Sequence, residues 1–314
     1  MTYYQQQAYP PAGAPKVKLF APTLPKAELR KFTTTSVWWG LLIPTVLLAL
    51  GWSWIATSFV SFITDRVVEG TRSLGVSADI PDLPFASFAL ARAINISTIF
   101  PIVLGGLAMA NEVQRRTMTT SYLTAPSRVS VLTAKFGFYA VVGAAYGVVV
   151  TGISSLGIWL GSVTGGHTQF LPSPGVWLGI VGAGILSTML WTLLGVGVGA
   201  LLGNVIATTL VLLLYTLLAE NLLNLAVVRI GDHVPGFLIN QSGSGIVSSI
   251  AADDVTSRIT DLPPRLSEGM TEVMRFAAGA GGTYSWWIEA LIFLVWTLIF
   301  AGLGWFVAQR RDVS

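Results

Sequence analysis

Long stretches without any charged side chain alternate along the chain with short polar segments. The uncharged stretches cover residues 32–64, 93–111, 136–219 and 290–309. A helix needs about 20 apolar residues to cross a bilayer, because each residue adds about 1.5 Å toward a hydrocarbon core of about 30 Å. Each stretch is therefore long enough for a membrane-spanning helix.

The longest uncharged stretch contains two turn signals, the Gly- and Pro-rich segment 165–175 and the pair Gly203-Asn204. These signals divide it into three spans. Backbone groups in lipid must bond to each other, which favours helices. The pattern predicts an all-α integral membrane protein with six spanning helices, at about residues 37–63, 90–111, 136–162, 175–202, 205–228 and 286–308.

Composition supports this class. Only 11% of the 314 residues are charged and 53% are hydrophobic, with a mean hydropathy of +0.69 and no Cys. Soluble domains are about 25% charged. These values exclude a soluble enzyme, a disordered chain and a disulfide-rich secreted domain.

The few charges are distributed unequally between the two sides that six spans define. All five Lys lie in the N-terminal segment or between spans 2 and 3, and the C-terminus adds Arg310 and Arg311. Because positive loops stay cytoplasmic, both termini are expected in the cytoplasm. The pI of about 9.3 then reflects topology, and no nucleic-acid partner is expected.

The polar segments between and before the spans give the remaining organisation. Residues 1–20 are rich in Gln, Pro and Ala and are expected to be a disordered cytoplasmic tail. An amphipathic helix should precede span 1, and residues 21–314 should form one transmembrane domain. Residues 229–285 are expected to form an external loop with short helices before the last span.

Small residues four apart mark contact faces in two spans, since small side chains let helix backbones approach closely. These stripes indicate packing within one chain, with dimerisation as the alternative; they comprise Gly143, Gly147, Thr151 and Ser155 in span 3 and Gly175, Gly179, Ala183, Ser187, Gly195, Gly199 and Gly203 in span 4. Pro44 and Pro101 lie inside spans 1 and 2 and are expected to kink them.

One polar face is expected within the membrane, on span 5. Thr216, Glu220 and Asn224 are four residues apart and would share a helix face. An intramembrane carboxylate is costly and indicates a functional site. The alternative is a structural carboxylate that reaches outward or bonds a neighbouring helix.

Several kinds of catalytic chemistry are absent from the sequence. No Lys follows a Gly, so the chain has no P-loop for ATP, and no His-Glu-x-x-His zinc motif occurs. No catalytic or metal-binding residues are therefore expected, and the chain is predicted not to be an enzyme.

The segment between spans 2 and 3 is the most informative part of the sequence. An acidic residue ends span 2, a Thr, a Leu and a Pro-Ser-Arg turn follow, and a Lys opens span 3; the positions are Glu112, Thr117, Leu123, Pro126, Ser127, Arg128 and Lys135. This pattern resembles the permease (membrane subunit) of ABC-2 type transporters. That family usually has Gly before the Thr, and here the position is Arg116. The six spans and the Arg310-Arg311-Asp312 ending agree with the resemblance.

The resemblance implies that the chain is a subunit of an ATP-driven exporter in the bacterial plasma membrane. Two such chains, identical or paralogous, would form the path, and separate cytoplasmic ATPase subunits would bind ATP and Mg. Residues 112–135 would couple to the ATPase, with Arg115 and Arg116 beside the motif residues. Spans 2 and 5 border the path in this family, which places Thr216, Glu220 and Asn224 near it.

Three other functions are weighed against this one. A secondary transporter would need broken helices and charges at mid-membrane, which the sequence scarcely offers. An intramembrane enzyme would need paired carboxylates, a Ser–His pair or a metal cluster within the spans. A membrane scaffold without transport is the third alternative, and the substrate itself cannot be read from the sequence.

Overall fold

A computed structural model describes residues 23–73, 85–117, 127–166, 168–227, 230–231, 234–258 and 284–310. These residues form helices and turns, and no β-strand occurs among them. The elements are α1 (Thr23–Thr34), α2 (Val37–Ser73), α3 (Phe85–Ser97), α4 (Ile99–Gln114), α6 (Arg128–Thr164), η1 (Thr168–Phe170), α7 (Pro174–Leu202), α8 (Val205–Leu214), the π-helical turn η2 (Tyr215–Ala219), α9 (Glu220–Val227), η3 (Val234–Phe237), α10 (Ile239–Arg258) and α12 (Trp286–Arg310).

The prediction of an all-helical protein with six spans is confirmed by length and composition. Six segments of the described chain are long and apolar enough to cross a membrane, and they are Val37–Ser58, Phe85–Gln114, Arg128–Thr164, Pro174–Leu202, Val205–Asn224 and Trp286–Arg310. Leucine, valine and tryptophan side chains cover much of their outer surface, as expected of helices surrounded by lipid. The number, length and apolar character of these helices are therefore those of a multi-pass membrane protein.

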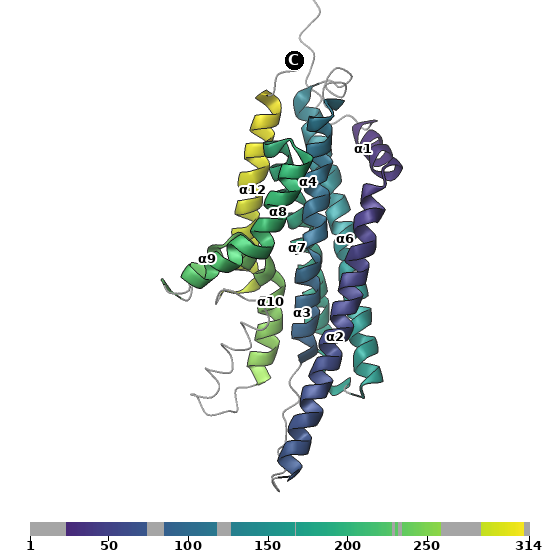
Figure 1. Cartoon of the computed structure of the whole chain (residues 1–314), viewed down its shortest axis with the longest axis vertical. Coiled ribbons are helices and arrows are strands. Elements are labelled where there is room, and N and C mark those ends of the chain that lie inside the picture. Colours follow the sequence, from purple (N-terminus) through teal and green to yellow (C-terminus); the bar gives the residue numbers. More distant parts are fainter. Residues whose placement is uncertain are drawn as a thin grey trace, which may run out of the picture.

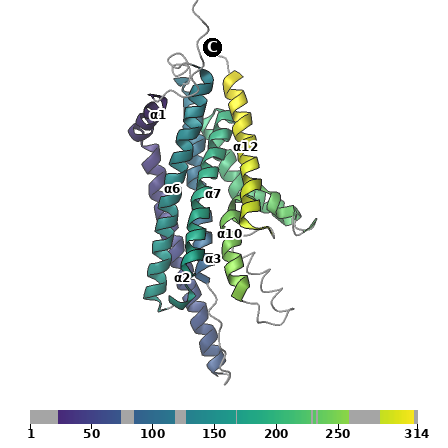
Figure 2. The ribbon, with the colours of Figure 1, turned by 180° about the vertical axis from the view of Figure 1, so that it is seen from behind.

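Helix α7 is the centre of the bundle. It packs against α4, α6, α10 and α12, and α2 lies on the outer side of α6 (Figure 1). The reverse view shows α12 and α6 on either side of α7 (Figure 2). The short helix α1, the end of α4, the start of α6 and the end of α12 lie at one end of the bundle.

Glycines allow the backbones of α4, α6 and α7 to pack closely together. A side-chain carbon added at Gly195 or Gly199 of α7 would collide with the backbone of α4, and one at Gly147 would lie 2.7 Å from the Cα of Ile185. Such contacts leave no room for any larger residue. The small-residue faces around Gly147, Gly195 and Gly199 therefore pack within the chain, as expected from the sequence, whereas a side-chain carbon added at Gly175 would meet nothing within 4 Å.

The turn signals of the sequence lie where helices begin and end. Helix α7 ends at Gly203, whose φ of +62° favours glycine, and Asn204 caps α8 by accepting a 2.9 Å hydrogen bond from the Ala207 N–H. Span 2 is interrupted at Thr98, three residues before Pro101. Proline has no N–H to donate, so the interruption has the expected cause.

Two loop boundaries differ from the expectation. Helix α2 runs through Pro44 to Ser73, so residues 64–73 continue the first helix instead of starting a loop. The 20-residue helix α10 belongs to the expected external loop 229–285, yet it packs against α3, α7 and α12. Hydrogen bonds inside the bundle explain its place there: Ser87 Oγ donates to Asp254 Oδ2 at 2.8 Å.

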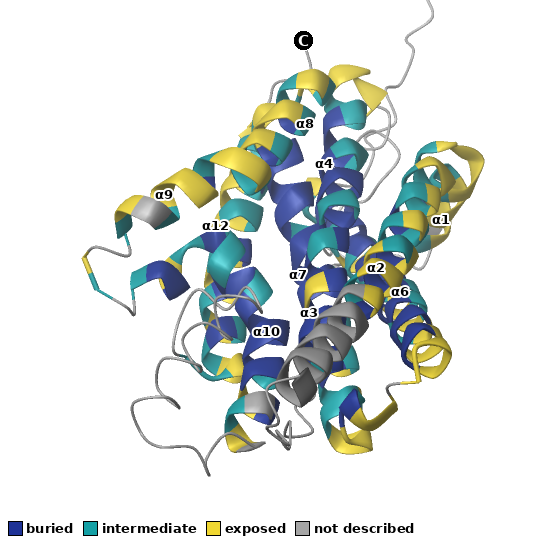
Figure 3. Ribbon diagram, turned by 60° about the horizontal axis from the view of Figure 1, so that its bottom comes forward, coloured by how far each residue is buried: buried dark blue, intermediate teal, exposed yellow. Residues whose placement is uncertain are grey.

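The buried residues are concentrated in the helices at the centre of the bundle. Figure 3 shows α3, α7 and α10 as the most buried elements, and α8 and α9 as largely exposed. Helix α9 projects sideways from the bundle in both Figures 1 and 2. The expected tail at residues 1–20 lies outside the described residues, as do Leu123 and Pro126.

Candidate functional site

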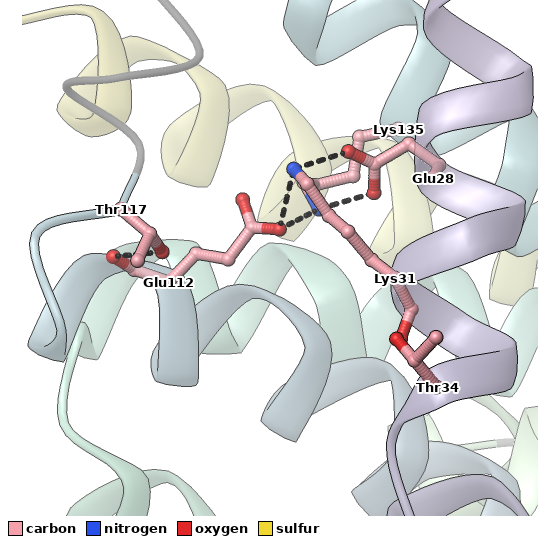
Figure 4. Close-up of polar contacts among 6 residues, drawn as sticks. All are labelled: Glu28, Lys31, Thr34, Glu112, Thr117 and Lys135. Atoms are coloured by element: carbon pink, nitrogen blue, oxygen red, sulfur yellow. Dashed lines mark hydrogen bonds and ion pairs between the residues drawn. The ribbon is translucent and has the colours of Figure 1, made fainter.

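Four charged side chains meet where α1, α4 and α6 come together (Figure 4). Lys135 Nζ lies 2.6 Å from Glu28 Oε2 and 2.9 Å from Glu112 Oε1. Lys31 Nζ lies 2.9 Å from Glu28 Oε1 and 3.1 Å from Glu112 Oε1. We call these four residues the charge cluster. It joins the N-terminal helix to the end of span 2 and the start of span 3.

The cluster is buried on the side of Lys135, whose side chain is 1% exposed, while Lys31 is 42% exposed. Burial of Glu28 raises the pKa of its carboxyl, but the charges of Lys135 and Lys31 and their hydrogen bonds outweigh this effect and lower the pKa. Glu28 is thus held in its charged form. Two carboxylates facing two ammonium groups leave no net charge to bury.

Aromatic packing holds α1 against α6 beside the cluster. The ring of Phe32 lies edge-on to Phe138 and Tyr139, at 5.8 and 6.4 Å between ring centroids. The Tyr146 hydroxyl donates to the backbone carbonyl of Trp38, and Lys135 Nζ lies 5.7 Å from the centre of the Tyr139 ring. The cluster therefore sits in a packed joint between three helices.

The cluster accounts for two of the predicted coupling residues, Glu112 and Lys135. Both were expected to belong to the segment that couples to an ATPase; in the structure their side chains contact each other and α1. Glu28 and Lys31 were not predicted as site residues from the sequence. Their signal is the spacing of three residues on the predicted amphipathic helix, which puts both on one face.

The residues that follow Glu112 are exposed. Arg115, Arg116 and Thr117 all lie on the surface, and the Thr117 hydroxyl donates to the Glu112 carbonyl at 3.4 Å. Arg116 has a φ of +57°, a left-handed conformation that favours glycine. This is the position where the ABC-2 type family usually has Gly. Both arginines are exposed and can be reached by another protein.

Ser127 and Arg128 fix the start of α6. The Ser127 hydroxyl caps the helix by accepting a 3.1 Å hydrogen bond from the Ser130 N–H. Arg128 Nη1 donates to the Gln309 carbonyl at 2.8 Å, which ties α6 to the end of α12. Both predicted coupling residues thus have structural partners within the chain.

The expected face of Thr216, Glu220 and Asn224 is divided by the π-helical turn η2. In a π-helix the hydrogen bonds run from residue i to i+5, so positions four apart no longer lie one above the other. Glu220 turns to α10 and is fully buried. Its Oε2 accepts from the Asn240 N–H at 2.7 Å and its Oε1 from the Gln241 N–H at 2.8 Å.

Glu220 is therefore a helix cap. The first N–H groups of α10 have no partner within the helix, and the helix dipole is positive at that end. A carboxylate at this position accepts hydrogen bonds from these N–H groups, and its negative charge interacts favourably with the positive end of the helix. The structure thus supports the structural alternative for Glu220, a bond to a neighbouring helix.

Thr216 and Asn224 instead line a cavity of about 550 Å³. We call it the lateral cavity. Its lining comes from α2, α3, α4, α7, η2, α9 and α10, and comprises Leu48, Arg92, Asn95, Ile96, Thr98, Ile99, Phe100, Ile102, Trp191, Thr216, Leu217, Asn221, Asn224, Asn240, Gln241 and Ser244. The size is typical of a small-molecule site. An amide-rich wall within spanning helices can hold a polar group away from lipid.

Most of the residues in this wall were not predicted from the sequence. Asn221 replaces Glu220 on the face of Thr216, because i and i+5 align across the π turn. Asn240 and Gln241 belong to a segment expected outside the membrane. Arg92 had one available signal, as an isolated charge directly before the uncharged residues 93–111.

The described part of the chain holds no group of three or more His, Cys, Asp or Glu side chains placed to bind a metal. Its two candidate sites are therefore a surface segment next to the charge cluster and a polar cavity among the spans. The first can transmit a movement between proteins, and the second can bind a small molecule. No protein-family model matches the chain, and no curated protein matches it significantly.

Proposed function

We propose that the chain is the permease subunit of an ATP-driven exporter of the ABC-2 type in the bacterial plasma membrane. Separate cytoplasmic ATPase subunits bind ATP and Mg, and two permease chains, identical or paralogous, form the path. The charge cluster carries the proposal. It clamps both ends of the segment 112–135 to α1 at the end of the bundle that we assign to the cytoplasm.

This arrangement suits the transmission of force. Helices α4 and α6 carry one side of the cluster each, through Glu112 and Lys135, so a push on the segment between them moves both helices as one body. Arg115 and Arg116 are exposed on that segment and offer positive charge to an acidic groove. The energy then comes from the ATPase, consistent with the absence of a Gly-Lys P-loop in the sequence.

The test is affinity purification of the full chain from its native host in mild detergent. We expect an ATPase with a P-loop to co-purify. Arg115→Glu should remove that partner because it reverses an exposed charge on the segment. The matched control is Lys26→Glu, which makes the same charge reversal at an exposed position of α1. An Arg115→Glu chain that retains the ATPase as well as the control does would refute the coupling role.

A secondary transporter is favoured by one observation, the presence of broken helices beside a polar cavity. Such transporters direct the positive end of a half-helix at the substrate. Here Glu220 of the chain itself occupies that end of α10. This end of α10 is therefore not free to bind a substrate, which removes the argument for a secondary transporter. Transport in purified vesicles that follows an ion gradient and needs no ATP would reverse the preference.

A further inference from the structure

The lateral cavity contains a charge without a partner. Arg92 lies on α3, within the second span, and its side chain is exposed to the cavity and the helix surface. No described residue forms an ion pair or hydrogen bond with it. A guanidinium within a spanning segment is costly and normally pairs with another group. The cavity thus offers a guanidinium that can pair with the anion of a ligand.

The same cavity has hydrogen-bond acceptors without a donor. Asn95 is 9% exposed; its Nδ2 donates to Ser248 Oγ at 2.8 Å and to the Ser244 carbonyl at 3.2 Å, and its Oδ1 has no partner among the described residues. Asn224 Oδ1 is likewise buried and unpartnered there. Because an unmet buried acceptor is costly, both oxygens call for O–H or N–H groups of a ligand.

The remaining wall is apolar and borders the outer surface. Ile99, Phe100 and Leu48 line the cavity, and Leu217 lines it while its side chain is 55% exposed on the lipid-facing helices. Such a wall can contact the acyl chains of a lipid that extends into the bilayer. A soluble ion would use none of this surface.

We propose that the lateral cavity binds an anionic membrane lipid whose head group carries hydroxyls. Its phosphate pairs with Arg92, its hydroxyls donate to Asn95 and Asn224, and its acyl chains pass Leu217 into the bilayer. Binding does not depend on the transport function. Only the conclusion that this lipid is cargo, which would name the substrate class of the exporter, rests on the proposed function.

The test measures lipid binding to the full chain, purified without any ATPase, by native mass spectrometry. Four probes are compared: phosphatidylglycerol, phosphatidic acid and phosphatidylcholine with identical acyl chains, and free glycerol 3-phosphate. We expect phosphatidylglycerol to bind about tenfold more tightly than phosphatidylcholine, whose choline cation offsets the phosphate charge and which has no hydroxyl to donate; this factor corresponds to about one hydrogen bond. Phosphatidic acid should fall between them, since it has a net negative charge and lacks the glycerol hydroxyls.

Two variants assign the contacts. Arg92→Gln should remove the preference for anionic lipid, and Asn224→Leu should lower phosphatidylglycerol binding to the level of phosphatidic acid. Arg115→Gln is the matched control, an equal loss of charge far from the cavity, and should bind as the unchanged protein does. A melting curve of each variant checks that it is folded.

The results that overturn the proposal are distinct. Equal binding of phosphatidylglycerol and phosphatidylcholine refutes the site, and so does an effect of Arg115→Gln as large as that of Arg92→Gln. Equal binding of phosphatidic acid and phosphatidylglycerol refutes the role of the hydroxyls. Glycerol 3-phosphate binding as tightly as the lipids identifies a soluble anion instead. None of these results bears on ATPase co-purification, which tests the transport function separately.

Discussion

Replacement of Lys135 by Met tests whether the charge cluster holds the three helices together. Methionine keeps the unbranched shape of the side chain and removes its charge. Glu28 and Glu112 then face each other with only Lys31, which is 42% exposed, to balance them. Breaking a buried ion pair from one side costs about 3–5 kcal/mol. We expect about 3 kcal/mol of lost stability, the low end of that range, because Lys31 stays in place.

Two comparisons make the expectation specific. Lys31→Met removes the partly exposed cation of the same cluster and should cost about 1 kcal/mol or less. The triple variant Lys135→Met, Glu28→Gln, Glu112→Gln removes every buried charge but keeps hydrogen-bonding groups, and should recover most of the loss. Unfolding in detergent micelles, followed by tryptophan fluorescence, measures all three. Lys135→Met being no less stable than Lys31→Met would refute the reasoning.

Three further changes test separate features. Because the pKa of Glu28 is lowered from its usual 4.5, its carboxylate stabilises the fold fully above about pH 4.5 and less as the pH falls through its folded pKa. The difference in melting temperature between the unchanged protein and Glu28→Gln should therefore shrink in acid; a constant difference contradicts this. Arg116→Gly should raise the free energy of unfolding by about 0.5–1 kcal/mol, because glycine adopts the left-handed conformation without strain and this gain exceeds the added entropy of the unfolded chain. Arg116→Val, melted in parallel, should lower the free energy of unfolding. A valine variant more stable than the glycine variant would show that Arg116 is not strained. Glu220→Gln loses one of two acceptors at the start of α10, so hydrogen exchange of the Asn240 and Gln241 amides should become faster. Unchanged exchange would show that the cap is dispensable.

The spans could be predicted from the sequence because charge is so costly in lipid that its absence marks each crossing. Helix ends could also be predicted, because they depend on residues next to them in the sequence. Gly203 and Asn204 act within one turn of the chain, so their effect is readable without knowledge of the fold. The interruption of span 2 before Pro101 has the same local origin.

Helix α10 could not be placed in the same way. Its Ser, Gly and Asp content is typical of a solvent-exposed segment, and only its partners in the bundle explain its burial. Gly243 lies against the Trp191 ring, where any larger residue would collide, and Asp254 accepts from Ser87. Such complementarity joins residues far apart in the sequence, and no periodicity within one segment reports it.

The candidate sites show the same limit. Glu112 and Lys135 were both noted in the sequence because they belong to one motif, whereas Glu28 reaches Lys135 across 107 positions. The π turn is a second cause of error. One extra residue in a helical turn rotates all later residues about the helix axis. Glu220 therefore does not lie on the face that a regular α-helix predicts, and Asn221 lies there instead.

The cap on α10 also links two walls of the lateral cavity. Glu220 belongs to α9 and holds the first turn of α10, and both helices line the cavity. A movement of α9 relative to the bundle therefore either breaks both hydrogen bonds of the cap or carries Asn240 and Gln241 along with it.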